Sequence, residues 1–172
     1  GGAGFDTLNG GDGTDTADFS DQTKSVVAVL NGSTQSLVII DGKSDDIIFN
    51  IENLTGGSSN DTLTGDTNNN ILIGGAGNDL LTGGAGFDTL NGGDGTDTAD
   101  YSDQTKSVVA VLNRSTPSLV TIDGKSDDTI FNIENLTGGS GNDTLTGDIN
   151  NNILFGGAGN DSLAGDDGND LL

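Results

Sequence analysis

Aspartate or asparagine recurs every nine residues along much of this chain, each time five residues after a glycine. Residues 56 to 100 divide without gaps into GGSSNDTLT, GDTNNNILI, GGAGNDLLT, GGAGFDTLN and GGDGTDTAD. Two more nonapeptides open the chain, and four, the last incomplete, run from 138 to 172. Ca²⁺ binds roughly six to eight oxygen atoms of carboxylates, carbonyls and water. Each glycine-rich turn offers several carbonyls and one carboxylate or amide, so the pattern predicts turns that supply about half of a calcium shell each.

The charge balance also favours small cations as partners. The 172 residues include 27 acidic and 5 basic side chains, for a net charge of -22, which repels nucleic acids and anionic membranes. The chain has neither Cys nor His, so thiolate zinc sites and disulfides are excluded. No apolar run reaches the ~18 residues of a membrane span, and we expect no membrane insertion. Two alternatives remain: intrinsic disorder, or a fold stabilised by bound cations.

Catalysis is not expected. No serine stands in a nucleophile context, and His and Cys are absent. Adjacent carboxylates such as Asp45 and Asp46 could serve acid–base chemistry, but such pairs arise by chance in a chain this rich in acids. We therefore expect a binding or structural protein rather than an enzyme.

The nonapeptides resemble the repeat-in-toxin (RTX) family, whose motif is G-G-x-G-x-D-x-U-x with U a large aliphatic residue. Eleven copies stand in this chain and cover roughly half of it. The resemblance implies an all-β fold, a calcium-bound parallel β-roll in which a six-residue turn and a three-residue strand alternate and two nonapeptides form one coil. It also implies an exported protein, extracellular or on the cell surface of a Gram-negative bacterium, that leaves the cell by type I secretion.

In the family pattern, one turn offers its first and third carbonyls and its Asp to each ion, and the stacked turn offers its second and fourth carbonyls and its Asp. This implies sites between the turns of Asp61 and Asp79, Asp79 and Asp97, and Asp143 and Asp161. Weaker sites are implied where Asn70 faces Asp88 and Asn152 faces Asp170, because asparagine lacks the charge. Asp6 and Asp15 belong to a pair whose stacking partners are cut off or displaced.

We expect about five or more Ca²⁺ per chain. The expected ligands are Asp6, Asp15, Gly56, Ser58, Asp61, Asn70, Gly74, Gly75, Ala76, Gly77, Asp79, Gly83, Gly84, Gly86, Asp88, Gly93, Gly95, Asp97, Gly138, Ser140, Asp143, Asn152, Gly157, Gly159, Asp161 and Asp170.

Short strands must position these turns. The last three residues of each nonapeptide carry the consistent apolar position, which is leucine in all copies except those of Ala17 and Ala99. A three-residue strand points its central side chain to one face. We expect a thin core of stacked leucines: Leu63, Leu72, Leu81, Leu90, Leu145, Leu154, Leu163 and Leu172.

A longer period of 82 residues divides the chain into two units, in which residues 1–90 match 83–172 with 14 differences. Nonapeptides are expected at 1–18, 56–100 and 138–172, and β-strand inserts at 19–55 and 101–137. Each insert holds two apolar runs, at 26–30 and 37–40 in the first unit, that predict a β-hairpin or two additional strands. The segment 41–49 can be read as a degenerate nonapeptide with Asp46 in the sixth place. Aromatic residues of the inserts are expected to shield the ends of the leucine core: Phe19, Phe49, Tyr101 and Phe131.

The function expected from these observations is a module that folds on binding extracellular calcium. The near-identical units favour a structural or adhesive array whose partners are calcium ions and neighbouring repeats. The chain begins within a repeat, so we expect a fragment of a longer protein. An alternative is the C-terminal secretion module of an exported protease, lipase or epimerase whose catalytic domain lies outside this sequence. Ice or glycan binding is a third alternative, although the mixed outward side chains do not favour an ice-binding surface.

Overall fold

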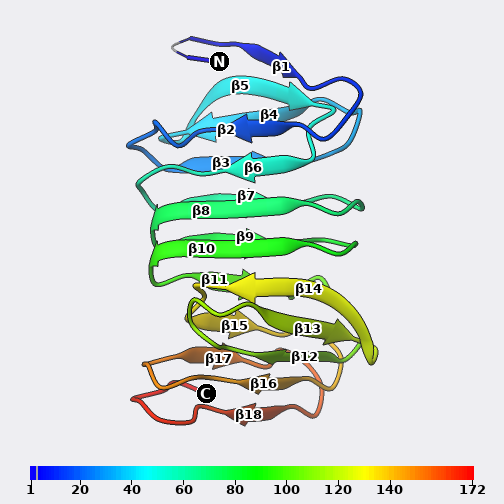
Figure 1. Cartoon of the computed structure of the whole chain (residues 1–172), viewed down its shortest axis with the longest axis vertical. Coiled ribbons are helices and arrows are strands. Elements are labelled where there is room, and N and C mark those ends of the chain that lie inside the picture. Colours follow the sequence, from blue (N-terminus) through cyan, green and yellow to red (C-terminus); the bar gives the residue numbers. More distant parts are fainter. Residues whose placement is uncertain (3) are drawn as a thin grey trace.

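Two nine-stranded sheets face each other and form a stack of flat coils (Figure 1). A computed structural model describes residues 1–2 and 4–172. Within this described part, every regular element is a β-strand, and there is no helix that could span a membrane.

The strands alternate between the two sheets, apart from the inserts. The first sheet contains, in spatial order, β1 (Thr7–Asn9), β5 (Lys43–Phe49), β4 (Ser36–Ile40), β3 (Val26–Val29), β7 (Thr62–Thr64), β9 (Leu80–Thr82), β11 (Thr98–Asp100), β15 (Asn135–Thr137) and β17 (Ile153–Phe155). The second contains β18 (Ser162–Ala164), β16 (Thr144–Thr146), β12 (Val108–Val111), β13 (Ser118–Ile122), β14 (Lys125–Phe131), β10 (Thr89–Gly95), β8 (Ile71–Gly77), β6 (Asn53–Thr55) and β2 (Thr16–Asp18).

Strands two nonapeptides apart pair in parallel and in register. Leu63 lies opposite Leu81 in the first sheet, and Leu72 lies opposite Leu90 in the second. One coil therefore consists of two nonapeptides. The predicted parallel β-roll is confirmed, and it places the six-residue turns one above another along two edges of the stack.

The core is a double column of central strand residues. Leu63, Leu72, Leu81 and Leu90 have no solvent exposure, and Ala17 and Ala99 occupy the same position where the leucine is absent. The column ends at the last coil. Leu163 is only partly buried, and Leu172 is 60% exposed because no further strand covers it, so the expectation that Leu172 joins the core is wrong.

Each insert is a meander of three strands rather than the two that the sequence predicted. β3, β4 and β5 pair antiparallel, and the meander joins the roll through parallel pairing of β3 with β7 and of β5 with β1. The third strand arises because Asp41 and Gly42 adopt left-handed φ values of 52° and 73°, which reverse the chain in a tight hairpin turn.

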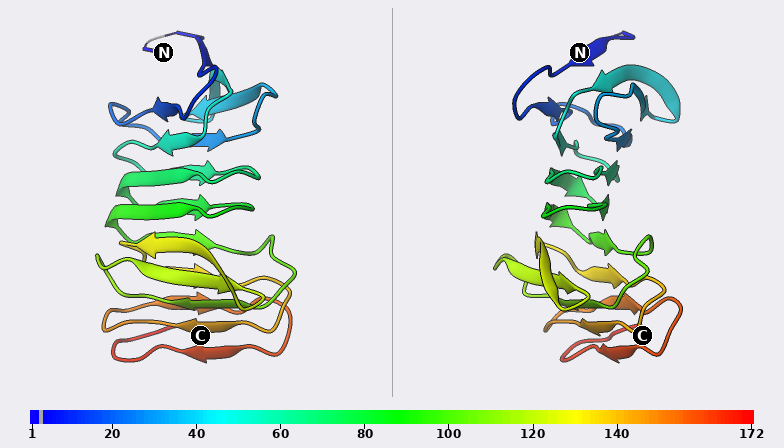
Figure 2. Two further views of the ribbon diagram at one scale, coloured as in Figure 1. Left: turned by 45° about the vertical axis from the view of Figure 1, so that its right-hand side comes forward. Right: turned by 90° about the vertical axis from the view of Figure 1, so that its right-hand side faces the viewer.

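The two inserts lie in opposite sheets. β3 to β5 belong to the first sheet, whereas their counterparts β12 to β14 belong to the second, and the side view shows them protruding on opposite sides (Figure 2). The insert aromatics divide into two kinds. Phe19 and Tyr101 are buried in the core, whereas Phe49 and Phe131 are only half-buried on the strands that end the meanders.

Candidate metal sites

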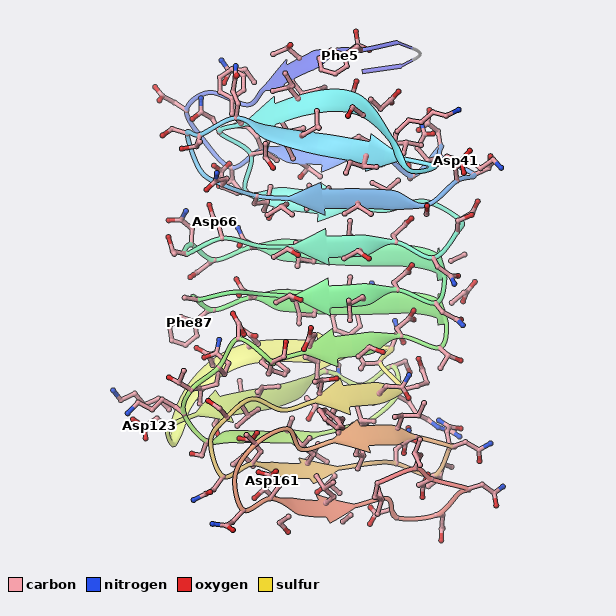
Figure 3. All side chains as sticks on the ribbon, turned by 180° about the vertical axis from the view of Figure 1, so that it is seen from behind. Phe5, Asp41, Asp66, Phe87, Asp123 and Asp161 are labelled. Atoms are coloured by element: carbon pink, nitrogen blue, oxygen red, sulfur yellow. The ribbon has the colours of Figure 1, made fainter. Side chains whose placement is uncertain are left out.

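The sixth residues of stacked turns are joined by a ladder of hydrogen bonds along each edge of the roll. The backbone N–H of Asp61 donates to Oδ1 of Asp79 at 2.8 Å, and the N–H of Asp79 donates to Oδ1 of Asp97 at 2.8 Å. The other predicted pairs are connected in the same way, with distances of 2.8 to 2.9 Å: Asn70 with Asp88, Asp143 with Asp161, and Asn152 with Asp170. The structure therefore brings together each pair of turns that the sequence predicted to share an ion. Figure 3 shows the edge that contains Asp66 and Phe87.

The turns fall into two conformational classes, and the first we call open turns. In these the second and fourth residues both have positive φ, as in Gly75 (111°) and Gly77 (125°). Glycine adopts this region without the penalty that a Cβ imposes. In the turn 165–170 the second position is Asp166, with a φ of 63°. The open turns are 1–6, 10–15, 74–79, 83–88, 92–97, 156–161 and 165–170.

Open turns leave one carboxylate oxygen of their Asp without a hydrogen bond. Among the described residues, the Oδ2 atoms that are buried without a partner belong to Asp6, Asp15, Asp79, Asp88 and Asp97. A buried, unpaired carboxylate oxygen costs several kcal/mol in a folded protein, in the range of about 2 to 7 for a polar group. A bound cation removes this cost.

Further oxygens converge on the same places. A Cβ added to Gly74 would lie within 3.0 Å of both Oδ2 of Asp79 and the carbonyl oxygen of Gly92 in the stacked turn. A Cβ on Gly92 would likewise meet Oδ2 of Asp97 and a stacked carbonyl. In the part of the chain that the structure describes, no group of three or more acidic side chains is arranged so that it could hold a metal ion by itself. Backbone carbonyls must therefore supply much of any shell, which suits the all-oxygen preference of Ca²⁺.

The electrostatics of the open turns also indicate missing positive charge. Burial, together with neighbouring carboxylates, raises the pKa of Asp79 and of Asp88 from 3.8 to about 7. The pKa of Asp97 is raised as well, mainly by burial. Over the described residues, the single ion pair joins Arg114 Nε to Asp148 Oδ2 at 3.8 Å. The protein's own cations therefore do not neutralise the open turns.

The second class, the closed turns, comprises 56–61, 65–70, 138–143 and 147–152. None of their described residues has positive φ, and the N–H of the second residue donates to the side chain of the sixth, as from Gly139 to Asp143 at 2.8 Å. Both oxygens of Asp61 accept backbone N–H groups, from Val26 and Gly57.

The asparagines of two closed turns are fully engaged by the protein. Oδ1 of Asn70 accepts the N–H of Asp66, and its Nδ2 donates to the carbonyl of Glu52 at 2.8 Å. Asn152 repeats this arrangement with Asp148 and Glu134. The expected ligand set is thus divided. The side chains of Asp61, Asn70, Asp143 and Asn152 use both of their polar atoms in hydrogen bonds, whereas Asp79, Asp88 and Asp97 of the open turns accept one N–H through Oδ1 and leave Oδ2 without a partner.

The sequence contains a signal for most of the closed turns. GGSSND, GDTNNN and GDINNN all lack the fourth glycine. The turn 138–143 is different, because it keeps Gly141 and is closed nevertheless. A Cβ on Gly141 would collide with the backbone of Lys106 and Ser107, so this turn packs directly on the insert.

Insert residues occupy stacking positions that the sequence did not assign to the sites. The N–H groups of Asp6 and Asp88 donate to Oδ1 of Asp46 and Asp128, each at 2.9 Å. The N–H groups of Asp15 and Asp97 donate to Oε2 of Glu52 and Glu134, at 2.9 and 2.8 Å. Asp46 and Asp128 stand in degenerate nonapeptides and could have been found from the sequence. The two glutamates lie outside the nine-residue period.

Comparison with known protein families identifies the same nonapeptide repeats. No curated protein shows a significant match. The sequence profile of the RTX calcium-binding nonapeptide repeat matches four times, at residues 1–21, 50–81, 73–103 and 136–172, which together cover more than half of the chain. With its nonapeptide period and parallel β-roll, the chain belongs to the RTX calcium-binding nonapeptide repeat family.

Proposed function

We propose that this calcium-binding repeat module folds when it meets Ca²⁺ outside the producing cell and serves as a structural repeat of a secreted or cell-surface bacterial protein. The observation that carries the proposal is the set of buried, unpartnered carboxylate oxygens in the open turns. A chain with a net charge of -22 cannot bury such groups at low cost unless a cation accompanies them.

The residues that would hold the ions are the open-turn aspartates, with Asp79 and Asp97 on one edge and Asp88 on the other. Bound calcium would supply positive charge and join each turn to the next one in the stack. The chain contributes the rest. Glycines let carbonyls approach the aspartates, and the ladder from each N–H to the next Oδ1 fixes the spacing between turns.

The thin core explains why binding would be coupled to folding. Most nonapeptides bury a single leucine or alanine, whereas ordering each residue costs roughly 1 to 2 kcal/mol of backbone entropy. Ion binding then becomes folding free energy, and neighbouring coils fold cooperatively, as in other solenoids.

The affinity range of comparable sites supports a location outside the cell. Extracellular calcium modules bind with dissociation constants on the order of 10⁻⁴ to 10⁻³ M, above the free calcium of a cytosol. A module of this kind stays unfolded before export and folds afterwards.

The contact between the two units supports a role as a repeat in an array. β9 of the first unit pairs in parallel with β11 of the second, and β8 pairs with β10, so the roll continues across the boundary without a linker. Additional units of the same sequence could extend the stack in the same way.

The test is far-UV circular dichroism of EDTA-treated protein during titration with Ca²⁺, with Mg²⁺ as the control. We expect a cooperative change from coil to β spectrum with Ca²⁺ alone. A β spectrum in EDTA that Ca²⁺ leaves unchanged would contradict the folding switch.

A further inference from the structure

Glu134 occupies the place of an open-turn aspartate at the point where the roll meets the second insert. Along this edge, each sixth residue donates its N–H to the carboxylate one coil further on, from Asp61 to Asp79 and from Asp79 to Asp97. The N–H of Asp97 continues the series by donating to Oε2 of Glu134 at 2.8 Å. The ladder therefore reaches a carboxylate that is not part of any nonapeptide.

The local backbone explains why this carboxylate belongs to a glutamate. β14 ends at Phe131 and β15 begins at Asn135, so the connection has only residues 132–134 instead of a six-residue turn. Asn132 turns the chain with a φ of 51°, and Ile133, at 2% exposure, fixes the connection to the core. The shorter connection places the backbone differently from a full turn, and the additional methylene of glutamate restores the reach of the carboxylate.

Three oxygen-bearing groups surround this junction. Asp97 is fully buried, its Oδ1 accepts the N–H of Asp79, and its Oδ2 is one of the buried oxygens without a partner. A Cβ on Gly92 would collide with both this Oδ2 and the carbonyl oxygen of Asn132, so the two oxygens face the same point. Glu134 adds a second carboxylate next to Asp97.

The first unit repeats the arrangement. The N–H of Asp15 donates to Oε2 of Glu52 at 2.9 Å, and Oδ2 of Asp15 is buried without a partner among the described residues. A Cβ on Gly10 would lie against this Oδ2 and against the carbonyl oxygen of Asn50. Asn50 turns the chain with a φ of 52°, as Asn132 does in the second unit.

We propose that each insert completes a calcium site with its own residues: Glu134 and the carbonyl of Asn132 with Asp97, and Glu52 and the carbonyl of Asn50 with Asp15. This inference rests on the proposed calcium binding and extends it from the nonapeptides to the inserts. Both sites are rigidly held, since the N–H groups of residues 134 and 135 donate to the carbonyl of Asp97, and those of residues 52 and 53 to that of Asp15. Calcium would thus bind each insert to the roll.

Each of these calcium sites lies on only one side of its glutamate. The carbonyl of Glu134 accepts the amide Nδ2 of Asn152 at 2.8 Å, and the carbonyl of Glu52 accepts that of Asn70 at 2.8 Å. On the side of each glutamate that faces the next coil, a hydrogen bond from an asparagine therefore stands in the position that calcium would occupy on the side that faces Asp97 or Asp15.

The experiment counts bound calcium in the full chain by equilibrium dialysis, at a free calcium concentration that just saturates the wild type. Glu134→Gln keeps an oxygen that can accept the N–H of Asp97, so the variant should fold, which circular dichroism verifies. We expect Glu134→Gln to bind one ion fewer and the double variant Glu52→Gln/Glu134→Gln two fewer. Asp123→Asn is the matched control, because it removes one charge from the exposed hairpin turn of the same insert (Figure 3) and should leave the count unchanged.

Glu134→Asp separates coordination from long-range charge. It keeps the charge but shortens the side chain, and we expect it to lose the same ion. Unchanged counts in the folded Gln variants, beside a wild type that binds calcium, would overturn the insert sites and leave the proposed function intact. A wild type that binds no calcium would overturn the proposed function itself.

Discussion

Replacing Asp79 with asparagine should stabilise the protein without calcium and destabilise it with calcium. Asp79 is 2% exposed and lies between two stacked turns, so it belongs to two of the predicted sites. Asparagine keeps an Oδ1 that can accept the N–H of Asp61 and replaces the unpartnered Oδ2 by an amide. The native Asn70 shows that such an amide can donate to a carbonyl of a neighbouring coil.

The magnitude in the absence of calcium follows from the pKa. Burial first, and the charges of Asp97 and Asp61 second, raise the pKa of Asp79 from 3.8 to about 7. One pKa unit corresponds to ~1.4 kcal/mol, so the charged Asp79 destabilises the calcium-free fold above pH 7 by up to about 4 kcal/mol. Structural relaxation reduces this cost, and we expect a gain on the order of 2 kcal/mol for Asp79→Asn at pH 8.

In the presence of calcium, Asp79→Asn should lower the stability of the fold instead of raising it. The variant loses a single charge that both sites share and a single oxygen, which becomes the amide nitrogen. A weakening on the order of tenfold per site corresponds to ~1.4 kcal/mol each. Two assays separate the effects. In EDTA at pH 8, Asp79→Asn should need less trimethylamine N-oxide than the wild type to reach a β spectrum. In saturating calcium, its urea midpoint should be lower.

Asp123→Asn provides the control for net charge, since it removes one carboxylate from an exposed hairpin turn. It should change neither the trimethylamine N-oxide concentration needed in EDTA nor the urea midpoint in calcium appreciably. If Asp79→Asn instead needed more osmolyte in EDTA, or kept its urea midpoint in calcium, the assignment of Asp79 as a buried ligand would be refuted.

Asp79 and Asp88 keep their protons up to a pH of about 7 in the folded state but release them near pH 3.8 when unfolded, so the calcium-free fold loses stability as the pH rises between these values. EDTA-treated protein should therefore show a stronger β signal at pH 5 than at pH 8. Equal signals at the two pH values would contradict the raised pKa values. Gly74→Ala places a Cβ against Asp79 and Gly92 and should lower the unfolding free energy in calcium by ~1 to 3 kcal/mol, whereas the exposed Thr67→Ala should not. Leu72→Ala empties part of a fully buried column and should cost ~2 to 5 kcal/mol in urea unfolding, compared with less than about 0.5 for Leu119→Ala at a 54% exposed position.

The β-roll could be predicted from the sequence because its information is local and repeated. Each nonapeptide contains its own turn glycines and its own core residue, such as Gly74 and Leu81, and a fixed period requires the coils to stack in one register. The pairing of Asp61 with Asp79 follows directly from this register.

The features that could not be predicted depend on contacts between distant segments. The turn 138–143 has the glycines of an open turn, but packing against the insert closes it. Glu134 follows no period, and its position beside Asp97 results from the path of the meander. The third insert strand was missed because the segment 41–49 fits a degenerate nonapeptide. Its last residues do pair in parallel with β1, but the nine-residue pattern does not show the antiparallel pairing of the same strand with β4.

The placement of the two meanders in opposite sheets decides which faces of the roll stay flat. Between β1 and β7 the first sheet holds three strands, whereas between β2 and β8 the second sheet holds only β6. The additional strands protrude from the roll as a ridge on that side (Figure 2). The second unit carries its ridge on the other side, since its meander lies in the other sheet. Each face of the roll is therefore flat in one unit and ridged in the other.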